Sequence, residues 1–330
     1  MLRFLHAVPD RFGLRSPFRI SRGVKTVADV VTVTIRQGDL VGRGEGVPYA
    51  RYGETVEGTL AAIDAVRPVI EAGEGRDALA RAMPPGAARN AVDCALWDLE
   101  ARLAGTSVAA LAGRLAPAPL ASALTIGIDS ADAMAAVARA AARAPLLKVK
   151  VDADGAADRL RAVRAAAPAP RLIVDPNESW TIDDLVRLED LLVECGVDLL
   201  EQPLPAGKDD ALAGRRWRVP VCADESLHTS GDLDGLAGRY THLNIKLDKT
   251  GGLTEALALA EAARSRGFGL MVGCMVCSSL GIAPAMLVAD GAEFVDLDGP
   301  LWLAQDRPGG VVDQNGVLSP PAPGFWGGAG

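Results

Sequence analysis

The sequence predicts an α/β protein built on a (β/α)8 barrel of the TIM type. From about residue 120 onward, short apolar runs recur, each run closes on a polar or sulfur-bearing residue, and helical patterns lie between the runs. The closing residues are Thr125, Lys150, Asp175, Glu201, Asp224, Lys246, Cys274 and Asp296. They stand 22 to 28 residues apart, which leaves room for a strand, a loop and a helix of about three turns.

Helix-boundary signals support this alternation. Ser130 precedes "ADAMAAVARAAARA" in the position of an N-cap, and Gly196 follows "TIDDLVRLEDLLVEC", where a helix would end. Eight strand-helix units of this kind imply a closed barrel.

The chain before the barrel has a different pattern. "VADVVTVTIRQGDLVGRGEG" alternates and turns at Gly38 like a hairpin, and "ARNAVDCALWDLEARLAG" is typical of an amphipathic helix that ends at Gly105. We therefore predict an α+β domain over residues 1–112, the barrel over 113–299 and a C-terminal segment over 300–330. That segment, rich in Pro and Gly, is expected to run back and pack on the first domain.

Composition excludes several classes of protein. With 49% hydrophobic and 23% charged residues, the chain of 330 residues can bury a large core. No apolar stretch reaches the roughly 18 residues of a membrane span, and charges interrupt the N-terminus, so we expect a cytoplasmic protein. The net charge of −8, without a basic run, argues against nucleic acid as a partner. Five cysteines without a zinc-ligand pattern predict reduced thiols.

Three carboxylates close successive strands of the predicted barrel. In such barrels the carboxyl ends of the strands form one face, so Asp175, Glu201 and Asp224 should converge there. Three anionic groups this close repel one another unless a cation lies between them, and hard oxygen ligands favour Mg²⁺ over zinc. The sequence therefore predicts a Mg²⁺ site, one per subunit.

Lysines flank this carboxylate trio. Lys148 and Lys150 share one face of their strand because they are two residues apart, and Lys246 enters from four strands away. A neighbouring ammonium, a divalent metal and burial would each push a lysine toward neutrality, which makes it usable as a base near neutral pH. A base, a metal and an opposing acid together describe proton abstraction next to a carboxylate.

Simpler interpretations exist for each residue taken alone. A K-x-K at a strand end is most often a solvated pair, and a single Asp or Glu there is most often a helix cap or turn former. The joint occurrence of these residues in barrel register argues against that interpretation. Asp296 and Asp298 share a face after the eighth strand and would suit a cationic substrate group such as an α-ammonium, although a turn before Gly299 explains the pair equally well.

The motifs resemble those of the enolase superfamily, and within its muconate-lactonizing subgroup those of the dipeptide epimerases. The segments that carry the likeness span nearly the whole chain: "PYARYGE", "GAARNAVDCALWDLEAR", "LLKVKVD", "VDPNESW", "LEQPLP", "ADES", "NIKLDKTGGLTEAL", "GCMVCSS" and "DLDGP". The resemblance implies a capping domain, a barrel and a returning tail. It implies Mg²⁺ on the three carboxylates, an acid/base pair of Lys150 and Lys246, and Lys148 assisting the substrate carboxylate.

The same resemblance implies the substrate contacts. Thr125 and the backbone around Cys274 and Val276 would touch the substrate, and Asp296 and Asp298 would hold its ammonium group. In the capping domain "RISRGVK" occupies the place of a specificity loop, where Arg22 or Lys25 could meet the side-chain carboxylate of a Glu. Neighbours expected to support the site are Asn177, Glu225, Asn244 and Asp248.

The leading hypothesis is Mg²⁺-dependent 1,1-proton transfer at the α-carbon of the C-terminal residue of a dipeptide, L-Ala-D-Glu/L-Ala-L-Glu from murein peptide turnover. A second hypothesis is a different enolate-forming reaction on the same scaffold: muconate cycloisomerisation, o-succinylbenzoate synthesis or N-acylamino acid racemisation. A third is an inactive barrel with a binding role. The expected partner is a small-molecule dipeptide, without nucleic acid or membrane, and a homo-oligomer is conceivable.

Overall fold

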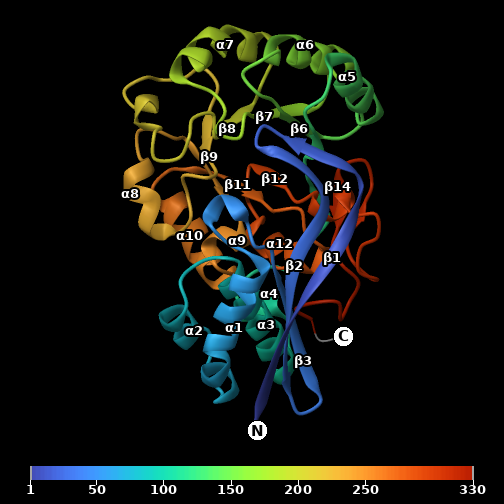
Figure 1. The fold of residues 1–330 in the computed structure, drawn as a ribbon, viewed down its shortest axis with the longest axis vertical. Coiled ribbons are helices and arrows are strands. Elements are labelled where there is room, and N and C mark those ends of the chain that lie inside the picture. The colour runs from blue at the N-terminus through green and yellow to red at the C-terminus, as the bar shows by residue number, and fades with distance from the viewer. Residues whose placement is uncertain (1, 329–330) are drawn as a thin grey trace.

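The computed structural model describes residues 2–328 and contains three sheets (Figure 1). The largest has eight parallel strands that follow one another in sequence order from β5 to β12. Its strands are β5 (Leu124–Ile126), β6 (Leu146–Lys150), β7 (Arg171–Asp175), β8 (Leu199–Glu201), β9 (Val221–Ala223), β10 (His242–Ile245), β11 (Gly269–Gly273) and β12 (Phe294–Asp296). The amide of Ala123, just before β5, donates to Val295 O at 2.8 Å, which joins the first strand to the last. The predicted barrel is confirmed.

Side chains inside the barrel form layers, because alternate residues of a strand face the same way. The lowest layer is a closed apolar cluster of Ala123, Leu146, Ile173, Leu199, Cys222, Met271 and Phe294. Lys148 and Lys150 follow Leu146 on the same face of β6, one and two layers higher. The apolar layer therefore closes the barrel from below, and polar residues occupy its carboxyl end.

Four long helices cover the outside of the barrel: α5 (Ala131–Ala140), α6 (Ala156–Ala166), α7 (Ile182–Glu194) and α10 (Leu253–Ser265). Ser130 caps α5 as expected, since its hydroxyl accepts from Ala133 N. Gly196 follows α7 with φ 59°, a left-handed conformation that glycine adopts without steric cost.

The expectation of a three-turn helix after every strand was wrong. The chain after β8 forms only a 3-10 turn, η2 (Asp210–Leu212), and after β9 it forms η3 (Ser230–Asp232) and α8 (Leu233–Leu236). After β10 comes α9 (Leu247–Thr250) ahead of α10, and after β11 come α11 (Ser279–Ile282) and α12 (Ala285–Val288). Pro and Gly recur in the crossover after β8, and both interrupt helices.

The N-terminal part is an antiparallel sheet packed on helices. Its elements are β1 (Arg3–Ile20), β2 (Gly23–Gln37), β3 (Leu40–Gly46), η1 (Ala50–Tyr52), α1 (Val56–Glu71), α2 (Arg76–Ala82), α3 (Ala87–Leu103) and α4 (Val108–Leu111). The turn at Gly38 (φ 62°) is where the alternation predicts it. Helix α3 was expected to be amphipathic, but most of its residues are buried because it lies between this sheet and the barrel helices α9 and α10.

The β1–β2 hairpin extends from the N-terminal sheet across the mouth of the barrel (Figure 1). Near its tip, Arg19 O accepts from Ile128 N at 3.1 Å, just after β5. Further down, Gly13 O accepts from Ala304 N at 2.8 Å in the C-terminal segment. The hairpin is therefore docked on both sides of the barrel opening.

The C-terminal segment, with η4 (Gly299–Trp302), β13 (Val312–Asp313) and β14 (Val317–Ser319), lies against both parts of the chain. Strand β14 pairs with β4 (Leu120–Ala121). Trp326 donates from its indole nitrogen to Arg43 O at 2.9 Å, and Gly327 N donates to Asp98 at 2.8 Å. Within residues 2–328 all five cysteines are free thiols, as expected, and no helix is both long and apolar enough to cross a membrane.

A stripe of glycines lets β3 lie directly on α3, and one of them gives a test of the fold. A Cβ on Gly44 would stand 2.1 Å from Ala91 O, a backbone atom that cannot rotate away. We expect Gly44→Ala to lower the free energy of unfolding by about 2–3 kcal/mol, measured by urea denaturation. Gly13→Ala is the matched control, since nothing lies within 4 Å of a Cβ there. Equal stability of the two variants would contradict this packing.

Candidate active site

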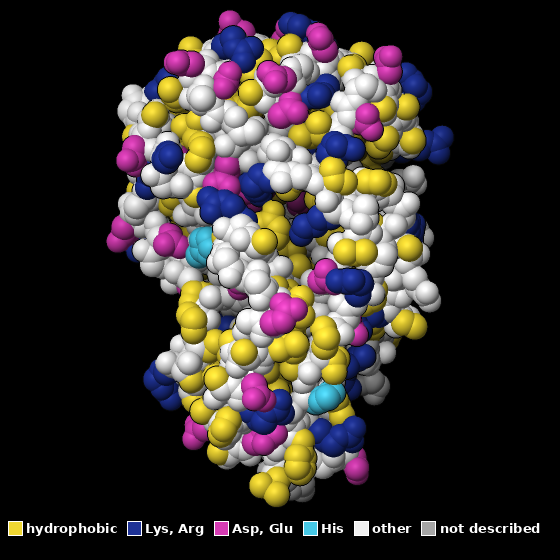
Figure 2. All heavy atoms as spheres, in the orientation of Figure 1, with side chains coloured by type: hydrophobic (Ala, Val, Ile, Leu, Met, Phe, Trp, Pro, Cys, Tyr) yellow, Lys and Arg dark blue, Asp and Glu magenta, His cyan; other side chains and the backbone are white. Residues whose placement is uncertain are grey.

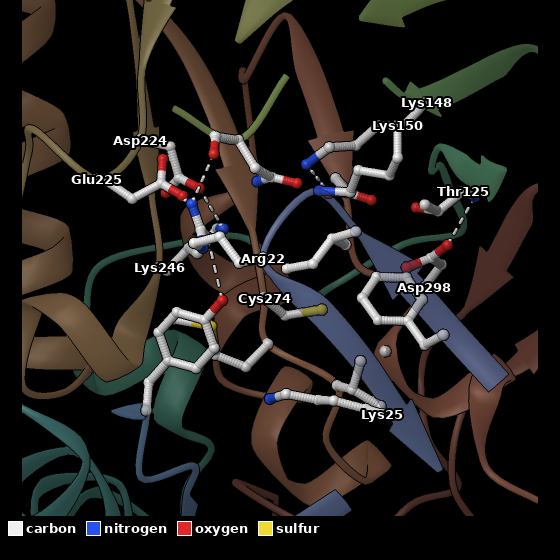
Figure 3. Close-up of a pocket in the computed structure, with 18 of the residues that line it drawn as sticks. Arg22, Lys25, Thr125, Lys148, Lys150, Asp224, Glu225, Lys246, Cys274 and Asp298 are labelled. Atoms are coloured by element: carbon white, nitrogen blue, oxygen red, sulfur yellow. Dashed lines mark hydrogen bonds and ion pairs between the residues drawn. The ribbon is translucent and has the colours of Figure 1, made fainter. Parts of the chain in front are cut away.

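The polar residues at the carboxyl ends of the barrel strands line a cavity beneath the β1–β2 hairpin (Figure 3). Lysine and arginine side chains gather around a hollow between the barrel and the N-terminal part on the face drawn in Figure 2. The predicted residues that line the cavity are Arg22, Lys25, Thr125, Lys148, Lys150, Asn177, Asp224, Glu225, Lys246, Cys274, Val276, Asp296 and Asp298. Segments from the barrel strands and from the hairpin thus meet at one place.

Asp175, Glu201 and Asp224 end or directly follow β7, β8 and β9, and all three are buried. Lys148 contacts two of them: its Nζ lies 3.2 Å from Asp175 Oδ2 and 2.7 Å from Glu201 Oε2. Burial first and Coulomb repulsion from Asp175 second raise the pKa of Glu201 to about 7. The trio is therefore held at close range by the lysines around it.

Lys150 and Lys246 approach the cavity from different sides. Lys150 Nζ donates to Asp175 Oδ2 at 2.5 Å, and Lys246 Nζ donates to Asp224 Oδ2 at 2.6 Å. Figure 3 shows Lys246 across the cavity from Lys148 and Lys150. The geometry brings the three lysines together as the sequence predicts.

The pKa values of Lys148 and Lys246 move in the opposite direction to the expected one. Burial alone would lower the pKa of Lys148, but Asp296, Glu201 and Asp175 outweigh it and raise the pKa well above its ordinary value. Burial is the largest influence on Lys246 and acts to lower its pKa, as does the nearby Lys148, but Asp224, Glu201 and Glu225 together outweigh them, so this pKa is raised too. The sequence argument counted the neighbouring cations and burial but not the direct contact of each ammonium with a carboxylate.

The carboxylates are ligands of the kind that a hard cation prefers, although their oxygens do not converge on one point. Within residues 2–328, no three His, Cys, Asp or Glu side chains stand close enough together to hold a metal ion as they are arranged. Each carboxylate faces a lysine instead. Among the residues that the structure describes, four buried oxygens around the mouth have no hydrogen-bond partner: Asn177 Oδ1, Glu225 Oε2, Asn244 Oδ1 and Asp296 Oδ1. Glu201 Oε2 has only the ion pair with Lys148. Buried oxygen acceptors without donors are ligands that Mg²⁺ accepts.

The rim opposite Lys246 holds the D-x-D pair. Asp296 Oδ2 accepts from Lys148 Nζ at 2.7 Å, and its other oxygen is without a donor among the residues that the structure describes. Asp298 Oδ2 accepts from Thr125 N at 2.8 Å, and burial first and Asp296 second raise the pKa of Asp298 to about 7. Cys274 lines the middle of the cavity in Figure 3. The pair therefore presents one free carboxylate oxygen beside the cavity.

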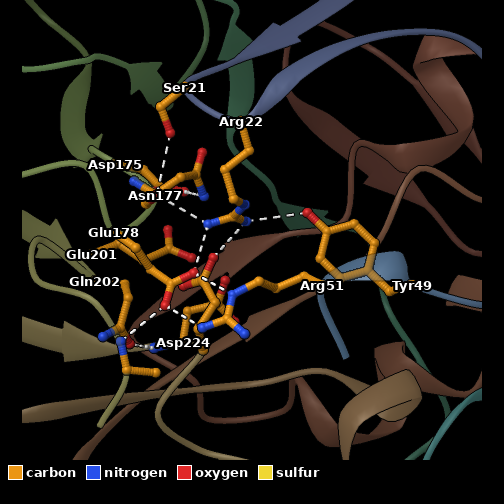
Figure 4. Close-up of polar contacts among 12 residues, drawn as sticks. Ser21, Arg22, Tyr49, Arg51, Asp175, Asn177, Glu178, Glu201, Gln202 and Asp224 are labelled. Atoms are coloured by element: carbon orange, nitrogen blue, oxygen red, sulfur yellow. Dashed lines mark hydrogen bonds and ion pairs between the residues drawn. The ribbon is translucent and has the colours of Figure 1, made fainter. Parts of the chain in front are cut away.

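The two cations of the hairpin differ in their contacts. Arg22 is bonded to Glu225, Glu178 and Tyr49, as Figure 4 shows in part. Lys25 Nζ lies 4.8 Å from the centroid of the Tyr49 ring and has no ion pair among the described residues. Of the two, Lys25 has the freer charge.

Three of the four expected supporting residues adjoin the site. Asn177 donates from its backbone and its amide to Asp175, and Asn244 donates to Glu201 at 2.8 Å. Glu225 follows Asp224 and pairs with Arg22 at 2.7 Å.

Asp248 was expected beside Lys246, and that expectation was wrong. The chain turns into α9 directly after Lys246, so spacing by two no longer means a shared face. Asp248 accepts instead from Val47 N at 2.9 Å and from the Asn90 amide at 2.8 Å, in the N-terminal part. Burial is the main cause that raises its pKa to about 7.

Sequence reasoning missed Lys249. This residue is 1% exposed, and its Nζ donates to Asp224 Oδ1 at 2.7 Å and to Asn244 O at 2.9 Å. Lys249 and Lys246 therefore hold the two oxygens of one carboxylate. The signal was available, because Lys249 stands three residues after Lys246, one turn of a helix. Glu178 was missed as well, since nothing in "VDPNESW" indicates contacts to the N-terminal part.

Comparison with known proteins agrees with this geometry. The description "Mandelate racemase / muconate lactonizing enzyme, N-terminal domain" matches residues 5–113, and "Enolase C-terminal domain-like" matches residues 130–325. An L-Ala-D/L-Glu epimerase of Escherichia coli is 47% identical over 307 residues, 92% of this chain and 96% of the relative. The chain belongs to the dipeptide epimerases of the enolase superfamily. The resemblance inferred from the motifs is confirmed.

Further members of the superfamily are also similar. An N-acetyl-D-glutamate racemase of Pseudoalteromonas is 43% identical, with 91% of this chain and 96% of the relative covered. An enolase family member from Agrobacterium tumefaciens, solved with sodium and L-Ala-L-Glu, superposes with a TM-score of 0.97 at 51% identity over 98% of this chain and 100% of the other. The dipeptide epimerase of Methylococcus capsulatus, solved with Mg and L-Arg-D-Lys, has a TM-score of 0.90 at 34% identity, with 100% and 99% covered.

Lys249 supplies a prediction about the carboxylate site. Lys249→Met keeps the length of the side chain but leaves Asp224 with one ammonium partner instead of two. We expect the free energy of unfolding to fall by about 3 kcal/mol, since removing one partner of a buried ion pair leaves the other charge uncompensated. Thermal or urea unfolding measures this, with the exposed Lys208→Met as control. Unchanged stability would mean that Lys249 does not hold Asp224.

Proposed function

We propose that this protein is a Mg²⁺-dependent dipeptide epimerase that inverts the α-carbon of the C-terminal residue by 1,1-proton transfer, with L-Ala-D-Glu/L-Ala-L-Glu as its substrate pair. The observation that carries the proposal is the position of Lys150 and Lys246, which reach one cavity from opposite walls. Two bases on opposite faces of one carbon are what an inversion by proton exchange requires. Family membership and the relatives named above support the same reaction class.

Asp175, Glu201 and Asp224 would hold Mg²⁺, with Asn177 and Asn244 orienting two of them. When bound, the cation would supply positive charge where the substrate carboxylate becomes an enolate. A carboxylate shared with a divalent cation stabilises a neighbouring ammonium group less, so the raised pKa of Lys246 would fall toward the working range of a base.

The chain's own groups would carry the proton steps. A neutral Lys150 or Lys246 takes the α-proton at its Nζ, and the ammonium on the other wall returns a proton to the opposite face. Lys148, between Glu201 and Asp296, would stay charged and stabilise the negative charge that develops on the carboxylate. Because either lysine can begin as the base, the reaction would run in both directions.

The remaining contacts select a dipeptide. Asp296 and Asp298 would bind the α-ammonium group, with Thr125 and the backbone at Cys274 and Val276 along the substrate. Lys25 would meet a side-chain carboxylate, which favours Glu as the C-terminal residue. These residue roles remain predictions, as do cell-wall peptide turnover, a cytoplasmic location and a homo-oligomeric state.

A second candidate is racemisation of an N-acylamino acid such as N-acetylglutamate. The 43% identity to an N-acetyl-D-glutamate racemase favours it over muconate cycloisomerisation and o-succinylbenzoate synthesis. Its substrate lacks a free ammonium group, so the D-x-D pair would have no cationic partner.

Isotope exchange tests the two-base mechanism. With Lys150→Ala, epimerisation should disappear, while exchange of the α-proton with deuterated water should continue from one epimer only, through Lys246. Mass spectrometry or NMR of both epimers measures this, and Lys246→Ala should give the mirror result. Exchange from both epimers in the Lys150 variant would refute the assignment.

The D-x-D pair separates the two substrate classes. Asp296→Asn together with Asp298→Asn should reduce kcat/KM for L-Ala-L-Glu by about 100-fold, because two charge-assisted contacts to the ammonium are lost. Turnover of N-acetylglutamate by the same double variant, followed by polarimetry, should not decrease. Asp290→Asn, an exposed aspartate a few residues away, is the control. If the double variant keeps full activity on L-Ala-L-Glu, the dipeptide assignment is wrong.

A further inference from the structure

The tip of the β1–β2 hairpin is tied to the barrel through one side chain. Arg22 Nη2 lies 2.7 Å from Glu225 Oε1 and donates to Tyr49 Oη at 3.1 Å. Its Nη1 donates at 3.0 Å to Glu178 Oε2 and to Asn177 O (Figure 4). A guanidinium suits this arrangement because its donors point in fixed directions in one plane. The terminal nitrogens of Arg22 are therefore engaged by protein acceptors.

The acceptors belong to the loops that carry the proposed metal ligands. Glu225 directly follows Asp224, and Asn177 and Glu178 lie two and three residues after Asp175. The Glu225 side chain is 1% exposed and that of Arg22 is 25% exposed. Solvent therefore screens the Arg22–Glu225 pair less than an open surface pair.

The loop that receives Arg22 has an unusual backbone. Asn177 and Glu178 have φ values of 47° and 68°, in the left-handed region that costs a residue with a side chain free energy. In this conformation Asn177 O accepts from the Ser21 hydroxyl as well as from Arg22. The strained segment thus presents its carbonyl to the hairpin tip.

The cavity under this tip is too small for the proposed substrate. Its volume is about 60 Å³, whereas sites for small molecules usually measure roughly 300–1,000 Å³. The hairpin tip, a two-residue turn between Ile20 and Gly23, covers the cavity. A dipeptide can enter and leave only if the contacts of this tip break.

We propose that Arg22 is a positioning residue that latches the hairpin tip over the bound dipeptide, and that it does not contact the substrate side chain. The inference rests on the proposed function and assigns the two cations of the tip different tasks. Arg22 binds Glu225, Glu178 and the Asn177 carbonyl, whereas Lys25 lines the cavity and has no ion pair among the residues that the structure describes. Loss of the latch would therefore weaken binding of every dipeptide alike.

The test compares two variants and two substrates. Arg22→Ala should raise KM by roughly tenfold for L-Ala-L-Glu and by a similar factor for L-Ala-L-Gln, which has the same shape without the charge, and kcat should change less. Arg22→Lys should restore part of the loss, since one ammonium cannot serve all four acceptors. The matched control is Arg51→Ala, because Arg51 contacts Glu178 but none of the other three acceptors. It should leave KM within about twofold of wild type.

Hydrogen exchange of the backbone amides gives a readout that does not depend on turnover. In Arg22→Ala, amides of residues 14–25 should exchange faster than in the wild type, and those of the Arg51→Ala hairpin should not. Unchanged exchange in Arg22→Ala would overturn the latch. A KM increase confined to L-Ala-L-Glu would overturn it too, because Arg22 would then be the ligand of the side-chain carboxylate.

The two proposals can fail separately. If the wild-type protein epimerises neither dipeptide, the proposed function is wrong, and faster hairpin exchange in Arg22→Ala would still support the latch. If the wild type is active and Arg22→Ala behaves like Arg51→Ala in both assays, only the latch is wrong.

Discussion

The compensation of buried charge at the mouth of the barrel is the constraint on which the rest of the structure depends. Asp175, Glu201 and Asp224 are buried and repel one another, which is unfavourable unless opposite charges lie nearby. Lys148 and Lys249, both 1% exposed, and the two lysines of the proposed acid/base pair supply those charges. Two of these ammonium groups, those of Lys150 and Lys246, also form the proposed acid/base pair, so their contacts would contribute to both stability and reactivity.

The surrounding architecture shields this charge cluster from solvent on two sides. The apolar layer of Leu146 and its neighbours closes the barrel below it, and the β1–β2 hairpin covers it from above. Glu45, buried at the junction, accepts from Ser278 N at 2.8 Å, while Arg307 of the C-terminal segment contacts both Glu45 and Asp10. Electrostatic interactions are stronger in such an enclosed region than in water. A cover made of a separate part of the chain can also open, which a sealed barrel could not do.

The sequence was sufficient for the strands and for the residues at their ends, because both follow from periodicity two and from the rule that parallel strands end on one face. Lys148 and Lys150 illustrate this, since their spacing alone orients them together. The sequence was insufficient where a strand ends and a helix begins within one motif. Asp248 turns away because α9 begins after Lys246, and the raised pKa of Lys148 depends on carboxylates from strands far apart in sequence. Contacts from the hairpin to Glu178 are likewise set by tertiary packing.

The loops that directly follow the strands are the places where the site is built. After β8, Gln202 has φ 33°, and its amide oxygen accepts from Asp224 N and Ser226 N. After β7, Asn177 and Glu178 both have left-handed φ values. Asn177 N donates to Asp175, and Glu178 accepts from Arg22. In a regular helix the backbone N–H and C=O groups bond to one another, so they would not be free to bond the carboxylates or the hairpin. These loops lack the hydrogen bonds of a helix. Side-chain hydrogen bonds that fix the carboxylates replace them and offset the cost of the strained backbone.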